Sequence, residues 1–178
     1  KLTNLELIDQ MPDGKVSNYL FRNNSNLNFT DESENWGLDF EGYSNGATYS
    51  DLDNDGDLDL ILNNINSKAK IYSNQSNEFY PERNFISINL IGDKLNKNGI
   101  GSKVTIWTGN KILYKENFAN KGFLSSTSPG LVFGLNNYEI IDSMLVQWPS
   151  GKAQKLYSIK GNKILNLYEK EARLKNNI

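Results

Sequence analysis

The segment that most constrains the fold runs from Asp51 to Asp59, where every odd position is an aspartate and the sixth position is Gly56. Five carboxylates this close together repel one another unless a cation lies among them. The coincidence of regular spacing and a glycine argues against the simpler alternative, a solvated acidic turn. The segment is therefore predicted to be a metal-binding loop.

The spacing also predicts how the loop would hold its ion. Alternation directs the first three side chains toward a common centre, and Gly56 allows a sharp turn at the sixth place. The seventh residue can then offer its backbone carbonyl, and the ninth closes the ring. Oxygen ligands in this number suit Ca²⁺ better than Mg²⁺. The predicted calcium ligands are Asp51, Asp53, Asp55, Asp57 and Asp59.

The residues around the loop predict strands on both sides of it. An EF-hand needs a bidentate glutamate at position twelve and a helix on each flank, but position twelve here is Leu62. Residues 46–50 are small and β-prone, whereas residues 58–63 alternate with a period of two. The loop is therefore expected to join two strands.

A repeat covers the first half of the chain. When the sequence is shifted by 51 residues, Tyr19–Asn26 aligns with Lys70–Asn77, and Phe29 aligns with Tyr80. Each copy predicts a short apolar strand, an Asn/Ser turn and a second strand that starts at the aromatic residue. Periods near 50 residues are typical of propeller-type arrays.

Residues 44–80 resemble the FG-GAP/VCBS repeat, the calcium-loop blade of integrin-like β-propellers. The resemblance implies the same ligand set, with Asp57 binding through its carbonyl. Residues 1–83 would then be about one and a half blades, with residues 1–30 as the tail of the first. A closed propeller needs about four to eight blades, so we expect a C-terminal fragment of a longer protein, in keeping with a first residue that is not Met.

The second half of the chain predicts a different all-β module over residues 84–172, followed by a tail at 173–178. Residues 108–111 read as a tight turn within a hairpin. No window keeps a helical period, so a small sandwich or barrel-like sheet is expected. The predicted strands cover residues 85–91, 101–107, 112–116, 131–134, 143–148, 153–157 and 163–168.

Four blocks stand out in this module, namely Asn98–Val104, Gly122–Ser126 with Pro129, Phe133–Leu135 and Val146–Gln154. In this order they resemble the ASPIC/UnbV domain, which commonly follows FG-GAP repeats in secreted proteins similar to cartilage acidic protein. The chain departs from the family at Asn136, where a glycine is usual, and at Ser126, where a glutamine is usual. The EGF-like module of animal relatives is absent because the chain has no cysteine, which favours a bacterial relative.

The composition excludes several classes of chemistry. With no Cys and no His, the chain holds no disulfide, no thiolate nucleophile and no Ser–His triad, and it lacks the preferred ligand of zinc and copper. The net charge is −2 and no basic run occurs, so the sequence lacks the cluster of positive charge with which proteins bind nucleic acid. No apolar segment approaches the length of a membrane span.

Three further groups of side chains are candidates for chemistry. Asp31, Glu32 and Glu34 could act as paired carboxylates in glycoside hydrolysis, although a solvated turn is favoured because nothing indicates burial. The hydroxyl-rich residues 125–128 resemble a nucleophile site only superficially, and a loop is expected there.

The aromatic residues allow two interpretations. Trp36, Tyr43 and Tyr49 could form a platform for a sugar ring, but aromatic residues in a blade more often belong to the core. Trp148 is also expected in the core.

Calcium loops of extracellular modules fill at about 10⁻⁴–10⁻³ M, a concentration met outside cells. The sequence therefore favours an extracellular or cell-surface protein, secreted or associated with the outer membrane of a bacterium. The expected function is non-catalytic: calcium-dependent adhesion to a protein or glycan partner, without nucleic acid or membrane insertion. The alternative is an accessory region of a larger secreted enzyme that acts on polysaccharide.

Overall fold

A computed structural model describes residues 14–175 of the protein. Residues 1–13 lie outside the described part, and with them the beginning of the segment 1–30 that is predicted as the tail of the first blade. Half of the chain is strand and 4% is helix, which confirms the all-β prediction. Within residues 14–175, no helix is long and apolar enough to cross a membrane.

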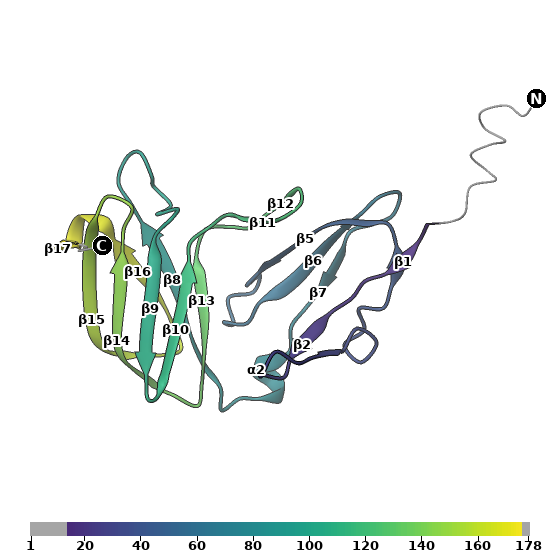
Figure 1. Cartoon of the computed structure of the whole chain (residues 1–178), viewed down its shortest axis with the longest axis horizontal. Helices are drawn as coiled ribbons and strands as arrows, with labels where there is room; N and C mark the ends of the chain where they lie inside the picture. Colours follow the sequence, from purple (N-terminus) through teal and green to yellow (C-terminus); the bar gives the residue numbers. More distant parts are fainter. Residues whose placement is uncertain (1–13, 176–178) are drawn as a thin grey trace, which may run out of the picture. The chain divides into compact units, whose positions relative to one another are not determined.

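The described part contains seventeen strands, which range from two to nine residues in length. Figure 1 shows their arrangement. In chain order they are β1 (Val16–Ser17), β2 (Phe21–Asn23), β3 (Phe29–Asp31), β4 (Glu41–Gly42), β5 (Ser44–Ser50), β6 (Asp59–Asn64), β7 (Lys70–Tyr72), β8 (Asn84–Ile91), β9 (Lys103–Thr108), β10 (Lys111–Glu116), β11 (Asn120–Gly122), β12 (Ser125–Ser126), β13 (Leu131–Asn136), β14 (Ile140–Gln147), β15 (Lys152–Lys160), β16 (Lys163–Tyr168) and β17 (Leu174–Lys175). The helix α2 (Ser76–Phe79) and the 3₁₀ turn η1 (Glu169–Glu171) complete the elements.

The chain divides into two compact units. Among the described residues, the first comprises residues 14–46 and 62–70, and the second comprises residues 47–61 and 71–175. Strands β5, β6 and β7 form one three-stranded sheet, and the boundary between the units passes through these strands.

The second unit contains a β-sandwich made of two sheets. The larger sheet has the order β10-β9-β14-β15-β17, and the smaller has the order β13-β8-β16. All pairings in these sheets are antiparallel except that of β16 with β8, which is parallel. Figure 1 shows these long strands gathered in one group.

The sandwich encloses the main hydrophobic core. Period-two alternation gives each long strand one apolar face, and both sheets turn that face inward. The side chains of Ile86, Ile106, Ile141, Met144 and Val146 are fully buried there. Because both sheets contribute to one cluster, the predicted sandwich is the observed arrangement.

Two turns in the sandwich depend on left-handed backbone. The predicted hairpin at residues 108–111 is confirmed: Thr108 pairs with Lys111, and Gly109 between them has a φ of +53°. At the end of β13, Asn136 has a φ of +50°. Glycine adopts that conformation without strain and asparagine tolerates it better than most residues, which explains how this chain keeps the turn without a glycine.

The first unit is built from smaller elements. Strands β2 and β3 form a hairpin, and β1 pairs with β4. Ser25, Asn26 and Leu27 all have positive φ in the turn between β2 and β3. Leu38 and Leu62 are the buried apolar side chains among its described residues.

The predicted second strand of the later repeat copy is wrong. Phe29 does begin β3, as expected, but the aligned Tyr80 follows the short helix α2. Its N–H donates to the Ser76 carbonyl oxygen at 2.9 Å. The Asn74 side chain accepts hydrogen bonds from the backbone N–H and the hydroxyl of Ser76, which starts a helical turn where the first copy has a hairpin.

Candidate metal centre

The acidic loop joins β5 to β6, as the sequence predicts. Its turn relies on Asn54 and Gly56, whose φ angles are +65° and +94°. A Cβ atom on Gly56 would lie 2.2 Å from the ring of Phe85, which no real contact allows. Gly56 is therefore required both by the backbone conformation and by the close approach of β8.

Three carboxylates of the loop converge. One oxygen from each of Asp51, Asp53 and Asp55 lies within 4.8 Å of the others. Alternation in the loop directs these three side chains to one centre, as the sequence predicts. Three like charges at this separation repel strongly unless a cation or protons neutralise them.

Hydrogen bonds inside the loop hold the carboxylates in place. The Gly56 N–H donates to Asp51 Oδ2 at 3.1 Å, and the Asp57 N–H donates to Asp55 Oδ1 at 2.9 Å. The other oxygen of Asp51, Oδ1, is buried and accepts no hydrogen bond. A buried carboxylate oxygen without a partner is costly, and a bound cation would supply the missing interaction. The donor set of the loop therefore fits a hard cation such as Ca²⁺.

The two remaining aspartates bind the loop to the residues after β7. Asp59 is buried, and its two carboxylate oxygens accept the N–H of Leu52 at 3.0 Å and the N–H of Asn74 at 2.9 Å. The Asp57 carboxylate accepts the N–H of Asn77 at 3.3 Å. Their side chains thus fasten the loop to the chain beyond β7.

Sequence reasoning missed the two asparagines that support the loop. Asn77 Nδ2 donates to the Asp55 carbonyl oxygen at 2.7 Å, and Asn74 Nδ2 donates to the Leu58 carbonyl oxygen at 3.2 Å. Both belong to the later repeat copy, so the repeat itself was the available signal. Their side chains satisfy backbone groups that the turn leaves open.

The environment of the loop disfavours negative charge. Burial raises the pKa of Asp51, and the neighbouring Asp55 and Asp53 raise it further. Burial also raises the pKa of Asp57 to about 6, with smaller contributions from Asp55 and Asp59. A bound cation reverses this balance because it stabilises the ionised form of each nearby carboxylate.

The carboxylates proposed for glycoside hydrolysis lie in a turn. Asp31 Oδ1 accepts hydrogen bonds from the hydroxyl and the N–H of Ser33, and these bonds lower the pKa of Asp31. Glu32 accepts a hydrogen bond from Asn35 at 2.8 Å. A general acid needs a raised pKa, so the direction of the Asp31 shift supports the predicted solvated turn.

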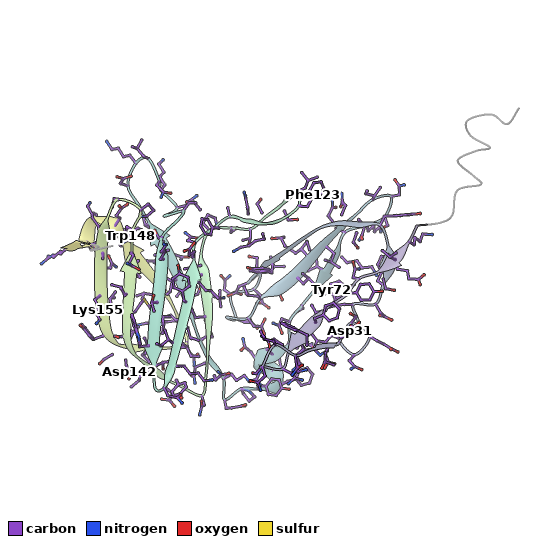
Figure 2. All side chains as sticks on the ribbon, viewed as in Figure 1. Asp31, Tyr72, Phe123, Asp142, Trp148 and Lys155 are labelled. Carbon is purple, nitrogen blue, oxygen red and sulfur yellow. The ribbon has the colours of Figure 1, made fainter. Side chains whose placement is uncertain are left out.

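The aromatic residues of the first half are more exposed than predicted. Trp36 is 55% exposed, and Tyr43 and Tyr49 are also exposed. Their predicted place in the core is therefore wrong, because their segments form short sheets with little apolar interior. Trp148, labelled in Figure 2, is 1% exposed and lies in the sandwich core, as predicted.

The hydroxyl-rich residues 125–128 bind backbone groups of β5. Ser125 and Ser126 form β12 and not the predicted loop. The Ser125 hydroxyl oxygen accepts the Ala47 N–H at 3.1 Å, and the Thr127 hydroxyl donates to the Tyr49 carbonyl oxygen at 2.6 Å. The hydroxyl groups of Ser125 and Thr127 therefore hold this segment against β5 within the second unit.

A cavity of about 450 Å³ lies beside the loop in the second unit. Its charged lining consists of Asp51, Lys115, Glu116 and Lys121. Lys115 Nζ donates to the Val132 carbonyl oxygen at 2.6 Å, and desolvation lowers its pKa. The cavity is polar and holds no histidine or cysteine, because the chain has neither.

The fold and the loop define an all-β chain in which an acidic turn precedes a β-sandwich. Residues 92–174 match the family model described as ASPIC and UnbV, which confirms that predicted resemblance over β9 to β17. Strand β8 precedes the matched region, although it is the central strand of the smaller sheet. No curated protein matches the chain. The resemblance of residues 44–80 to the FG-GAP/VCBS repeat stays a prediction.

Proposed function

We propose that this protein is a non-catalytic, calcium-stabilised binding module of a secreted or cell-surface protein, with a protein or glycan partner. The proposal is carried by the convergence of three carboxylates, one of which, Asp51, has a buried oxygen that accepts no hydrogen bond. Bound Ca²⁺ would complete that arrangement.

The proposed ligands are the side chains of Asp51, Asp53, Asp55 and Asp59 and the backbone carbonyl of Asp57. The ion links the end of β5 to the start of β6, and the hydrogen bonds to Asn74 and Asn77 extend that link beyond β7. Its role is therefore structural, as in a blade of a propeller. Bacterial origin, adhesion and an extracellular location follow from the resemblance and from the calcium concentration that such loops need.

Thermal unfolding tests the metal site directly. Chelator-treated protein should gain about 2.7 kcal/mol of stability when free Ca²⁺ reaches a hundredfold excess over its Kd, measured as a rise in Tm. Asp53→Ala should abolish most of this rise because it removes a converging carboxylate. Asp39→Ala is the matched control, since Asp39 is an exposed aspartate outside the loop.

Mg²⁺ at the same concentration should give a smaller rise, because it requires a tighter octahedron and retains its waters. An unchanged Tm on adding Ca²⁺, or an equal response in wild type and Asp53→Ala, would refute the calcium site.

A further inference from the structure

The outer face of the larger sandwich sheet is unusually apolar for a surface that no other sheet covers. The core-facing side chains of β9 and β14 are Val104, Ile106, Met144 and Val146. Alternation therefore places the intervening residues on the opposite side, the outer face. The strand register arranges them in two neighbouring rows. The first row is Ile112, Trp107, Ser143 and Tyr157, and the second is Tyr114, Thr105, Leu145 and Lys155.

Aromatic rings reach this outer face from three strands. Tyr114 is 53% exposed and Tyr157 is 65% exposed, while Trp107 is half-buried. The solvent face of an antiparallel sheet is normally polar. A group of exposed rings in such a place indicates a surface that binds something.

One positive charge lies at the centre of this face. The Lys155 ammonium (labelled in Figure 2) lies 5.8 Å from the ring centroid of Trp107 and 5.3 Å from that of Tyr157. Within residues 14–175, no carboxylate forms an ion pair with Lys155. The two rings therefore hold an ammonium group that is available to an anion.

Two carboxylates of the same sheet, on β10 and β14, bind other groups. Glu116 pairs with Lys103 at 3.6 Å and accepts a hydrogen bond from the Tyr114 hydroxyl. Asp142 accepts the N–H of Gly109 at 2.8 Å. The Lys155 ammonium can therefore pair with a negatively charged group of a partner.

We propose that the outer face binds an acidic polysaccharide, one whose sugar rings carry carboxylate groups. A pyranose ring has an apolar C–H face that stacks on an aromatic ring and a polar edge that hydrogen-bonds. Trp107 and Tyr157 are two strands apart, about 10 Å, which is about the length of a disaccharide. The hydroxyl of Ser143 lies between them in the same row, and Lys155 supplies the cation for a carboxylate.

A polysaccharide fits this face better than a protein partner. The core of a protein interface is a contiguous patch depleted of charge. Here Thr105 and Ser143 separate the rings, and a lysine occupies the centre. The proposal rests on the proposed role as a binding module and adds the class of ligand and the surface that takes it.

Calorimetric titration of the full chain with hexagalacturonate tests the proposal, with cellohexaose as the neutral probe. We expect hexagalacturonate to bind more tightly and its affinity to fall with added salt. Lys155→Ala should weaken hexagalacturonate binding at least about tenfold and leave cellohexaose binding unchanged. Tyr157→Ala should weaken the binding of both sugars, because it removes a stacking surface.

Two matched controls lie outside the outer face. Lys163→Ala removes an exposed lysine of β16 in the other sheet, and Phe123→Ala removes an exposed ring between β11 and β12. Both should bind as wild type does. Lys155→Glu provides a second test, because a reversed charge should abolish hexagalacturonate binding even where a truncation has a small effect.

The proposal is overturned if neither sugar binds, or if Lys155→Ala and Tyr157→Ala bind hexagalacturonate like wild type. Sedimentation that shows a dimer lost in Tyr157→Ala would instead assign the face to a second copy of the chain. Each titration is repeated with Ca²⁺ and with chelator. If hexagalacturonate binds but Ca²⁺ does not raise Tm, the calcium site is refuted and the sugar-binding face is kept. If Ca²⁺ raises Tm but neither sugar binds, the sugar-binding face is refuted and the calcium site is kept.

Discussion

The five aspartates of the acidic loop divide into two groups by what their oxygens bind. Asp51, Asp53 and Asp55 converge, and one oxygen of Asp51 accepts no hydrogen bond. Asp57 and Asp59 reach the chain beyond β7, where Asp57 accepts the N–H of Asn77 and Asp59 accepts the N–H of Asn74. The same residue type thus serves two purposes, because the three converging carboxylates crowd negative charge that a cation would neutralise, whereas Asp57 and Asp59 also fasten the loop through backbone donors. Each Asp59 oxygen keeps a second lone pair for the proposed ion.

A hydroxyl contact at Asp31 gives a prediction about pH. Ser33→Ala removes the hydroxyl donor to Asp31 and should raise the pKa of Asp31 toward 3.8, the ordinary value of an aspartate. In wild type, the folded-state pKa is the lower one, so the contact stabilises the fold above pH 3.8 and this stabilisation is lost as the pH falls through the folded pKa. NMR titration of the Asp31 carboxyl measures the change.

Ser33→Thr is the conservative control, since it keeps the hydroxyl and should titrate like wild type. The Ser33 hydroxyl oxygen also accepts the Leu20 N–H at 2.7 Å, so chemical shifts of the Leu20 amide report on that second effect separately. An unchanged Asp31 titration in Ser33→Ala would show that the backbone N–H of Ser33 alone sets the pKa.

At the scale of elements, the long strands of the sandwich were predictable and the short ones were not. Alternation over six to eight residues marks β8 and β9 clearly, whereas only residues 153–157 of the nine-residue β15 were predicted. Strands β1 and β4 have two residues each, too few to show a period. The loop spacing predicted the convergence of three carboxylates, but Asn77 supports the loop across 22 residues, a tertiary contact that spacing cannot reveal.

The turn between β13 and β14 gives a prediction about stability. Asn136 has a φ of +50°, where glycine is free of the Cβ strain that other residues bear. Asn136→Gly should therefore leave stability unchanged or raise it by up to about 1 kcal/mol. Asn136→Val should lower it by about 1–2 kcal/mol, because a β-branched residue fits this conformation poorly. Urea denaturation measures both free energies of unfolding.

The side chain of Asn136 is exposed, so lost packing should contribute little to either variant. Asn120→Val serves as the control for added β-branched bulk, because Asn120 is an exposed residue in β11. Equal losses in both valine variants would contradict an explanation based on the left-handed backbone.

At the scale of the whole molecule, the two compact units differ in how much apolar surface they bury. The sandwich has one continuous core that draws on both of its sheets. The first unit has Leu38 and Leu62 as its buried apolar side chains within the described residues. Since apolar burial dominates the stabilising side of folding, the stability of the chain is concentrated in the second unit.

Hydrogen exchange should reveal this difference. Amides of β9 and β14 are predicted to be the most protected, because both strands pair on two sides in the larger sheet and carry core residues. Amides of β2 and β3 should exchange fastest among the strands, since all their residues are exposed. Mass spectrometry of peptides after timed labelling provides the measurement. Equal protection in the two groups would contradict the uneven distribution of stability.

The parallel pairing of β16 with β8 has a consequence for synthesis on the ribosome. Asn89 and Asn166 are hydrogen-bonded partners 77 residues apart in sequence. While the chain emerges, β9 and β10 can pair across their two-residue turn almost at once, but β8 waits for its neighbour until β16 has left the exit tunnel. At about 5–20 residues per second, this delay lasts several seconds, during which one edge of the central strand is open to cellular chaperones.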